Sequence, residues 1–204
     1  MFEPGGPRPH PDVGRLAKEA ASCERCPLYA RATQLVFGEG PAHAPVMFVG
    51  EQPGDQEDRS GRPFVGPAGG VLDTALREAG LARSQSYVTN VVKHFKWEEQ
   101  GKRRLHKRPN RYETEQCRWW LDQELLAIDP KLIVALGAFA SSALMKRPVV
   151  LRRERGKLLQ WADGRSGLAT IHPSAVLRAP DSAARALMLQ DFIADLEVVV
   201  SFAA

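Results

Sequence analysis

Short apolar runs alternate along the chain with longer segments whose apolar residues recur at helical spacing. The apolar runs predict buried β-strands at 46–50, 87–92, 132–136, 158–161 and 168–171. The helical spacing predicts α-helices at 12–22, 68–79, 112–128, 138–145 and 182–198. Strands that alternate with helices favour a mainly parallel sheet covered by helices on both faces, which is a three-layer α/β/α architecture.

Length and composition favour a single domain. The chain has 204 residues, of which 44% are hydrophobic, and this is enough for one sizeable core. We expect the domain to span 12–204, after a flexible tail at 1–11 that is rich in Gly and Pro and lacks the apolar core of a signal peptide. No apolar run approaches the roughly 20 residues that a membrane-spanning helix needs. A cytoplasmic location is therefore expected.

Positive charge is concentrated in two places, although the formal net charge is only +4. One group of Lys and Arg lies within 102–111 and the other within 146–155. The first group falls in the segment 93–110, a long loop without strand or helix pattern, and such loops are usually functional or disordered. Clustered positive charge indicates a polyanionic partner such as nucleic acid. A solvated loop is the simpler alternative for one group taken alone.

Two of the predicted strands end directly in polar residues with turn chemistry. The segment 50–55 (GEQPGD) follows the apolar run 46–49, and the segment 172–174 (HPS) follows the run 168–171. In an open α/β sheet, ligands bind at the carboxyl ends of the strands. A carboxylate, an amide and a histidine at this edge indicate chemistry on a small polar ring or a sugar, and the pattern alone does not say which.

The cysteines indicate a metal or cluster site. Cys23 and Cys26 form a C-x-x-C pair, and without a thioredoxin-like βαβ unit around it this spacing favours metal binding over a disulfide. Cys117 supplies a third thiolate, and His94, just after the strand 87–92, is the best candidate for a fourth ligand. The alternative is two surface thiols, a buried cysteine and an ordinary loop histidine. Three cysteines and one histidine also suit tetrahedral zinc.

Several ordered blocks give a more specific indication. They are CxxCPL at 23–28, VFGEG at 36–40, VGEQPGDxED at 49–58, GxPFVGPAG at 61–69, TNVVK at 89–93, Cys117, LG at 136–137 and HPS at 172–174. This set spans most of the chain and resembles the iron–sulfur, family-four branch of the uracil-DNA glycosylases. It is most similar to the X-type enzymes, which link themselves covalently to uracil-containing DNA.

Two departures from the ordinary family-four pattern point to the X-type. The pair Lys93-His94 stands where those enzymes carry a cluster cysteine, and the segment 102–107 (KRRLHK) is inserted where they have a short loop. The resemblance implies a central, mainly parallel four-stranded sheet and a structural 4Fe-4S cluster. The cluster ligands that it implies are Cys23, Cys26, His94 and Cys117.

The resemblance also implies roles for the residues at the strand ends. Phe64 would stack on a uracil flipped out of the DNA, and Asn90, whose amide both donates and accepts, would separate uracil from cytosine. His172 would donate to uracil O2, where negative charge develops as the glycosidic bond breaks. The uracil-binding residues implied are Gln52, Gly54, Asp55, Phe64 and Asn90.

The inserted loop changes the expected reaction. An ordinary glycosylase orients a water near Glu51 to attack C1′ of the sugar, whereas the imidazole of His106 is a better nucleophile and would form a histidine–sugar bond. Glu51 would accept or orient the imidazole proton. The catalytic residues implied are His106, Glu51 and His172. The DNA-binding residues implied are Lys102, Arg103, Arg104, Lys107, Ser174 and Arg178.

These implications together describe a monomeric DNA-repair enzyme that excises uracil, prefers single-stranded DNA and traps itself after one turnover. Two alternatives remain. An ordinary turnover uracil-DNA glycosylase would keep the strand-end residues but would not need His106. A zinc-stapled nucleic-acid-binding module would use the basic loops but would not need Glu51, Asn90 and His172 together.

Overall fold

The computed structural model describes residues 11–203, so the tail predicted at 1–11 lies, except for Pro11, outside the described residues. Its main sheet has five strands in the order β2-β1-β5-β7-β6. The first four run parallel to one another, and the edge strand β6 is antiparallel to β7. The strands are β1 (Val46–Gly50), β2 (Ser86–Asn90), β5 (Leu132–Leu136), β6 (Leu158–Gln160) and β7 (Ser166–Thr170). The mainly parallel sheet is confirmed.

The expectation of four strands is wrong by one. The chain turns back after β6 through Trp161 and Gly164, and the resulting hairpin adds β6 to the edge of the sheet beside β7. Gly164 has φ +85°, a left-handed conformation that glycine adopts without the steric cost of a Cβ. An antiparallel edge strand on an otherwise parallel sheet is common in α/β folds.

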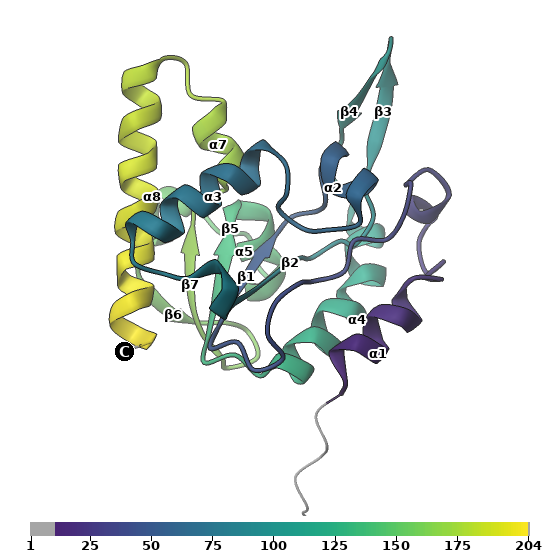
Figure 1. Ribbon diagram of the computed structural model, residues 1–204, viewed down its shortest axis with the longest axis horizontal. Helices are drawn as coiled ribbons and strands as arrows, with labels where there is room; N and C mark the ends of the chain where they lie inside the picture. The colour runs from purple at the N-terminus through teal and green to yellow at the C-terminus, as the bar shows by residue number, and fades with distance from the viewer. Residues whose placement is uncertain (1–10, 204) are drawn as a thin grey trace, which may run out of the picture.

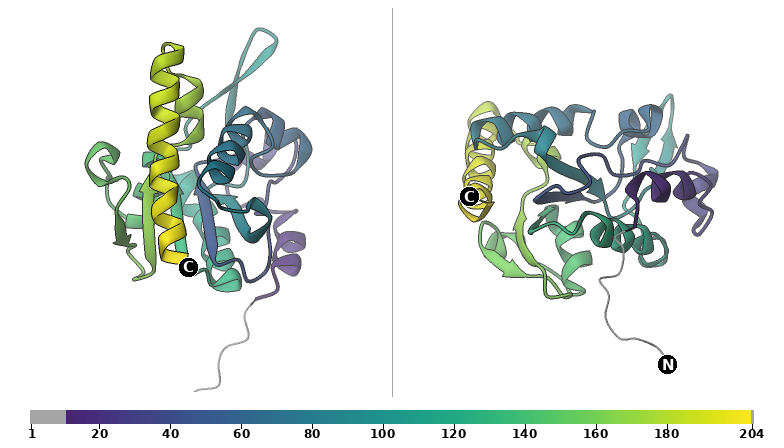
Figure 2. Two further views of the ribbon diagram at one scale, coloured as in Figure 1. Left: turned by 60° about the vertical axis from the view of Figure 1, so that its left-hand side comes forward. Right: turned by 60° about the horizontal axis from the view of Figure 1, so that its bottom comes forward.

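Helices cover both faces of the sheet, as the alternating pattern predicts (Figures 1 and 2). The helices α3 and α8 pack on one face, and α1, α4 and α5 pack on the other. The helices are α1 (Val13–Ala20), α2 (Asp55–Ser60), α3 (Pro67–Glu78), α4 (Arg111–Ile128), α5 (Gly137–Met145), α6 (Leu151–Glu154), α7 (Pro173–Leu177) and α8 (Ser182–Ala203). Two 3-10 turns accompany them, Pro27–Ala30 and Arg83–Gln85.

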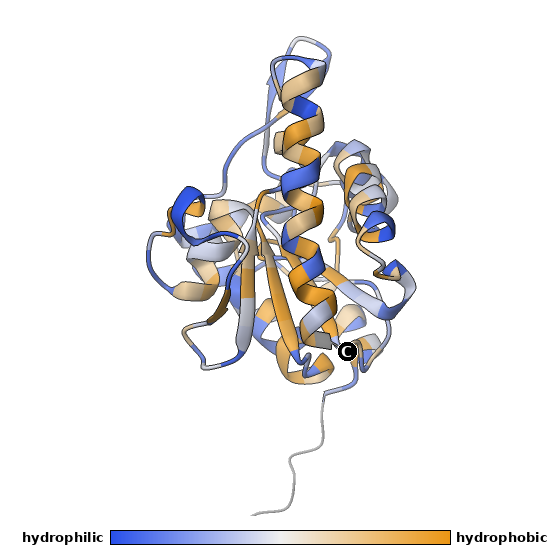
Figure 3. Ribbon diagram, turned by 90° about the vertical axis from the view of Figure 1, so that its left-hand side faces the viewer, coloured by the Kyte–Doolittle hydropathy of each residue, from blue (hydrophilic) through white to orange (hydrophobic). Residues whose placement is uncertain are grey.

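The strands are hydrophobic on both sides because each face meets a helical layer. Every residue of β1, β2 and β5 is buried, and the orange strands behind α8 in Figure 3 display this composition. Phe48 and Val134 face the layer of α3 and α8, whereas Met47 and Ile133 face the layer of α1, α4 and α5. This period of two places adjacent residues of one strand in different cores.

The helix boundaries follow from local capping. The Asp12 side chain accepts hydrogen bonds from the backbone N–H groups of Gly14 and Arg15 at the start of α1. Asn110 and Glu113 form a reciprocal capping box at the start of α4. No helix within residues 11–203 has both the length and the apolar character that crossing a membrane requires.

The segment 93–110, for which we predict an unpatterned loop, contains a β-hairpin instead. The strands β3 (Trp97–Gln100) and β4 (Arg103–His106) pair antiparallel around Gly101, whose φ is +59°. The hairpin extends beyond α2, away from the main sheet (Figure 1). Its strands are largely charged and exposed, so they lack the alternation of apolar and polar residues by which a strand is found in a sequence.

Candidate active site

A cavity of about 790 Å³ opens at the carboxyl ends of the parallel strands. The ends of β1, β2, β5 and β7 each contribute to it, through Glu51, Asn90, Gly137 and His172 respectively. The structure thus brings together residues that lie far apart in the sequence. Of the residues singled out from the sequence, those that line the cavity are Glu51, Gln52, Gly54, Phe64, Asn90, His106, His172, Ser174 and Arg178.

Phe64 is held in a strained conformation at the cavity wall. Its φ of +54° lies in the left-handed region, which is unusual for a bulky residue and often marks a functional site. A Cβ on Gly50 would lie 2.7 Å from the Phe64 ring and 2.3 Å from Asn90 Oδ1. The absence of a side chain at Gly50, the last residue of β1, therefore leaves room for both of these side chains.

His172 is neutral and its tautomer is fixed by its neighbours. Its Nδ1 accepts a hydrogen bond from the backbone N–H of Ser174 at 3.1 Å, so the ring proton is placed on Nε2. Desolvation, together with the charges of Arg178 and His106, lowers the pKa of His172 to about 4. Arg178 Nη1 also donates to Ser174 Oγ at 2.9 Å, and this hydroxyl lies 2.7 Å from His172 Nδ1.

Glu51 and His106 face each other across the cavity. The distance from Glu51 Oε1 to His106 Nε2 is 3.9 Å, and Oε1 is a buried atom without a hydrogen-bond partner among the described residues. Burial raises the pKa of Glu51, while the guanidinium groups of Arg108 and Arg178 oppose this rise. Desolvation, followed by the charge of Arg178, lowers the pKa of His106, although half of its side chain is exposed. Both shifts favour uncharged groups at this point.

The hairpin that carries His106 is attached to the sheet through Gln52. The side-chain Nε2 of Gln52 donates to the carbonyls of Lys96 and Lys107, at 3.3 and 2.9 Å, and its Oε1 accepts from the Lys96 N–H at 3.0 Å. Lys96 and Lys107 directly flank β3 and β4. The Gln52 side chain therefore joins the end of β1 to the base of the hairpin. Because its amide is used in these bonds, Gln52 can contact a ligand in the cavity only through its backbone.

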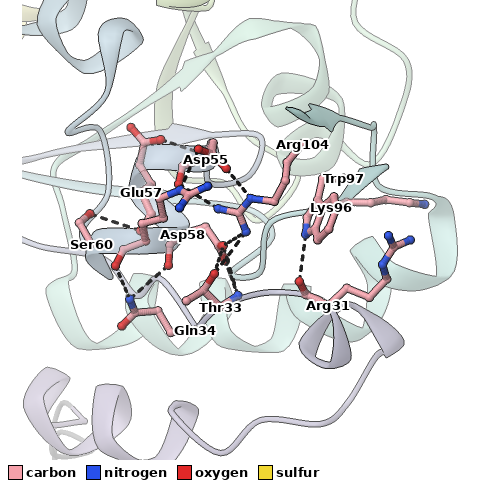
Figure 4. Close-up of polar contacts among 12 residues, drawn as sticks. Arg31, Thr33, Gln34, Asp55, Glu57, Asp58, Ser60, Lys96, Trp97 and Arg104 are labelled. Carbon is pink, nitrogen blue, oxygen red and sulfur yellow. Dashed lines mark hydrogen bonds and ion pairs between the residues drawn. The ribbon is translucent and has the colours of Figure 1, made fainter. Parts of the chain in front are cut away.

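A second attachment is made by Arg104. Its guanidinium donates to Asp55 Oδ1 at 2.5 Å and to Asp58 Oδ2 at 2.6 Å (Figure 4). It also lies over the rings of Phe95 and Trp97. Only 15% of the Arg104 side chain is exposed. The sequence suggested that Arg104 binds DNA and Asp55 binds uracil. In the structure Arg104 and Asp55 form an ion pair with each other. Asp55 is not among the described residues that line the cavity.

The remaining basic residues of the hairpin differ in their surroundings. Lys102 and Arg103, at the tip, are exposed and make no ion pair within residues 11–203. Lys107 Nζ pairs with Glu98 across the hairpin at 2.8 Å. Lys102 and Arg103 are thus the hairpin cations that are free to meet a polyanion.

Some lining residues were missed at the level of sequence. Glu57 accepts from the backbone N–H groups of Gly54 and Gly66 at 3.0 and 2.7 Å, and so joins the loop after β1 to the loop after Phe64. Arg108 lines the cavity and lies over the ring of Phe139. Arg108 falls in the basic segment 102–111 and could have been chosen on charge, whereas the contacts of Glu57 depend on the folding of two separate loops.

Cys26 and Cys117 belong to the hydrophobic layer of α1 and α4, and Cys23 packs against it. Desolvation raises the pKa of Cys117 to about 12, and the neighbouring Cys26 and Cys23 contribute to the rise. The indole N–H of Trp120 donates to Cys23 Sγ at 3.0 Å, and the backbone N–H of Lys93 donates to Cys117 Sγ at 3.1 Å.

The fourth expected ligand is His94, the residue after Lys93. His94 is buried directly after Lys93, and burial lowers its pKa, which favours the neutral imidazole that binds metals. Within residues 11–203, no three His, Cys, Asp or Glu side chains are arranged as a ready-made site for a single metal ion. The three thiols with N–H donors directed at Cys23 and Cys117 nevertheless have the donor chemistry of cluster ligands, because hydrogen bonds to sulfur are a regular feature of iron–sulfur sites.

Comparison with known proteins gives a consistent result. The profile of the Uracil DNA glycosylase superfamily matches residues 37–197. A type-4 uracil-DNA glycosylase of Thermotoga maritima is 36% identical over 177 residues, which cover 86% of this chain and 88% of that protein. One from Pyrobaculum aerophilum is 38% identical over 179 residues, covering 83% and 86% of the two chains, and one from Sulfurisphaera tokodaii is 34% identical over 186 residues, covering 87% and 80%.

Proposed function

Because the chain belongs to the uracil-DNA glycosylase superfamily, we propose that it excises uracil from DNA and then holds the deoxyribose covalently on His106. Uracil excision is supported by the type-4 relatives, which bear that activity in their names. The covalent step rests on one observation, the position of His106 Nε2 in the cavity, 3.9 Å from Glu51 Oε1. This is where an ordinary glycosylase would keep a water.

The cavity supplies the groups that a flipped uracil needs. Flipping costs a few kcal/mol, which the pocket offsets by stacking and hydrogen bonding. Phe64 stacks on the base, and the amide of Asn90 donates to and accepts from its Watson–Crick edge. The backbone around Gln52 and Gly54 donates to the base, since neither residue presents a side chain there.

Bond cleavage is assisted by His172 and Glu51. The electron pair of the C1′–N1 bond leaves with uracil, and the Nε2–H of the neutral His172 donates to O2, where this charge gathers. The sugar becomes an oxocarbenium-like cation, which the nearby carboxylate of Glu51 stabilises. A neutral His172 is suited to this role because it can donate a proton in a hydrogen bond without carrying a charge itself.

The protein is trapped because His106, and not water, attacks C1′ of the sugar. A ring nitrogen of His106 donates its lone pair to C1′ and forms an N–C bond, and the charge left on the ring is removed when its N–H proton passes to Glu51. The lowered pKa of His106 supports this role, because only a neutral imidazole has a free lone pair. The uracil departs, and the protein stays joined to the DNA.

A 4Fe-4S cluster bound by Cys23, Cys26, His94 and Cys117 is part of the proposal. Glycosidic cleavage transfers no electrons, so the chemistry that the cluster supplies is structural, tying α1 to α4 and to the segment after β2. The chain's own contribution is the donor set described above, with N–H groups directed at two of the sulfurs.

The DNA is held by residues at the tip of the hairpin and at the wall of the cavity. Lys102 and Arg103 bind the backbone phosphates near the flipped nucleotide, and Ser174 and Arg178 bind the DNA at the cavity wall. Single-stranded DNA is the preferred substrate in this proposal, because its bases are already unpaired and flipping costs least. The protein acts as a monomer in the cytoplasm.

One experiment tests this function against its alternatives. The protein is mixed with an oligonucleotide carrying one uracil, and both free uracil and a protein–DNA band that survives boiling in detergent are measured. The wild type should release about one uracil per protein and give the band, whereas a His106→Ala variant should release uracil with turnover and give no band. Turnover by the wild type without a band would establish the ordinary glycosylase. Equal binding of uracil-free DNA without any release would establish a binding module.

A further inference from the structure

A buried ion pair lies at the end of the strand that carries Asn90. The side chains of Lys93 and Glu124 are fully buried, and Lys93 Nζ donates to Glu124 Oε2. The ammonium also donates to Thr89 Oγ1 at 2.6 Å and to the Asn90 carbonyl at 2.7 Å. All three N–H bonds of the ammonium are therefore used, and one of them ends on the residue proposed to recognise uracil.

The carboxylate of this pair is fixed from its other side. Glu124 Oε1 accepts from the Gly38 N–H at 2.9 Å and from the Tyr87 hydroxyl at 3.0 Å, and Thr89 Oγ1 lies 3.0 Å from both carboxylate oxygens. A Cβ on Gly38 would lie 2.3 Å from the Tyr87 ring and 2.4 Å from Glu124. Glycine is required at this position because the carboxylate and the phenol fill the space.

The ammonium fixes the orientation of one peptide group. The strand β2 is at the edge of the sheet, and the Asn90 carbonyl at its end bonds to Lys93 instead of to a neighbouring strand. The N–H of the same peptide group, which belongs to Val91, donates to the Gly50 carbonyl at 2.9 Å. The Asn90–Val91 peptide is thus held on both sides, and its plane determines the direction in which the Asn90 side chain leaves the backbone.

The main chain of Lys93 is itself anchored. Its N–H donates to Cys117 Sγ at 3.1 Å, and its carbonyl accepts from the Val36 N–H at 2.8 Å. The backbone from which the Lys93 side chain extends to Asn90 is therefore fixed. Asn90 Oδ1 lies in the space that a side chain on Gly50 would fill. Each of these contacts is buried, so water does not replace a lost bond at low cost.

We propose that Lys93, held by Glu124, is a positioning residue that orients Asn90 for the recognition of uracil. Neither Lys93 nor Glu124 lines the cavity, so both act through Asn90 and do not touch the base. This inference rests on the proposed function, since it assigns Lys93 to the preference for uracil and not to cleavage.

The test is a double-mutant cycle between the ion pair and Asn90. Removing Lys93 alone would leave Glu124 charged and buried, which destabilises the fold, so the variant used is Lys93→Met together with Glu124→Gln. The probe is a single-stranded oligonucleotide with 2′-fluoro-deoxyuridine, whose fluorine disfavours the sugar cation and so permits a binding measurement without cleavage. The same oligonucleotide with 2′-fluoro-deoxycytidine is the reference, and the ratio of the two affinities is the preference for uracil.

The expected result is a loss of this preference by about tenfold in the pair variant and less than about twofold when Asn90 is already replaced by Ala. A merely structural pair would lower both affinities together and leave their ratio unchanged in either background, and that outcome would overturn the proposal. Val199→Ala, a core substitution on the buried side of α8, serves as a control for lost stability and should leave the ratio unchanged. A wild type without preference for uracil would reject the proposed function as well, whereas preference that survives in the pair variant rejects only the role of Lys93.

Discussion

At the scale of single residues, the charge states of the cavity depend on its desolvation. Burial raises the pKa of Glu51 above its ordinary value of 4.5 and lowers that of His106 below its ordinary value of 6.5. His172, with a pKa of about 4, stays neutral over the range between these values. The reaction needs a carboxylate at Glu51 and a neutral imidazole at His106, so it is lost only when one of these groups takes up a proton.

This arrangement predicts the acid limb of the pH–rate profile. The rate of adduct formation should fall as the pH is lowered, with a half-point above 4.5, the ordinary pKa of a glutamate side chain, because burial raises the pKa of Glu51. The measurement is the single-turnover rate of the heat-stable band at a series of pH values and constant ionic strength. A half-point at or below 4.5 would mean that Glu51 titrates like an exposed glutamate and would contradict the proposed desolvation.

A substitution of Asn90 should change the preference of the protein for uracil over cytosine. Asn90→Asp replaces the amide donor with an acceptor while the side chain keeps its size. It should destabilise the transition state for uracil excision by about 1–3 kcal/mol and allow cytosine to bind. The check is single-turnover release of uracil and of cytosine from otherwise identical oligonucleotides. Unchanged uracil release in this variant would move the recognition role to another residue.

At the scale of elements, the strand ends were predictable from the sequence and the hairpin was not. The runs before Glu51 and His172 are apolar and short, and each is followed by residues with turn chemistry, so the edge at which they meet follows from parallel pairing alone. The hairpin that carries His106 is stabilised by Gln52 and Arg104, whose partners lie far away in the sequence. Local patterns along the sequence do not contain such contacts.

The attachment of the hairpin predicts separable effects of two neighbouring arginines. Arg104→Gln removes the ion pairs to Asp55 and Asp58, so His106 is held less closely, and adduct formation should slow between about 10- and 100-fold. Uracil release should change less, because it depends on the strand ends. The measurement compares the rates of band formation and of uracil release in the same samples.

Arg103→Gln is the matched control for this substitution. Arg103 lies at the exposed tip of the hairpin and makes no ion pair within the described part of the chain. Its loss should weaken DNA binding and reduce the salt dependence of the affinity by about one unit of slope, with band formation unchanged at saturating DNA. Equal slowing of band formation in both variants would show that Arg104 acts through DNA and does not position the hairpin.

At the scale of the whole molecule, the proposed cluster joins three parts of the chain that are separate in the sequence. Cys23 and Cys26 follow α1, Cys117 lies within α4, and His94 follows β2. The purified protein should be brown, with a broad absorbance shoulder near roughly 400 nm, as expected for thiolate-bound iron–sulfur clusters. Cys117→Ala should remove this absorbance and lower the thermal midpoint. A colourless protein with stoichiometric zinc would contradict the prediction.

The central claim is that His106 itself forms the bond to the sugar, and its most direct test is to locate that bond. The heat-stable complex with a uracil-containing oligonucleotide is digested with a protease and a nuclease, and the modified peptide is sequenced by tandem mass spectrometry. The account predicts one modified residue, His106, carrying a deoxyribose without its base, because uracil leaves as the N–C bond forms. A sugar found on any other residue, or on none, would contradict it.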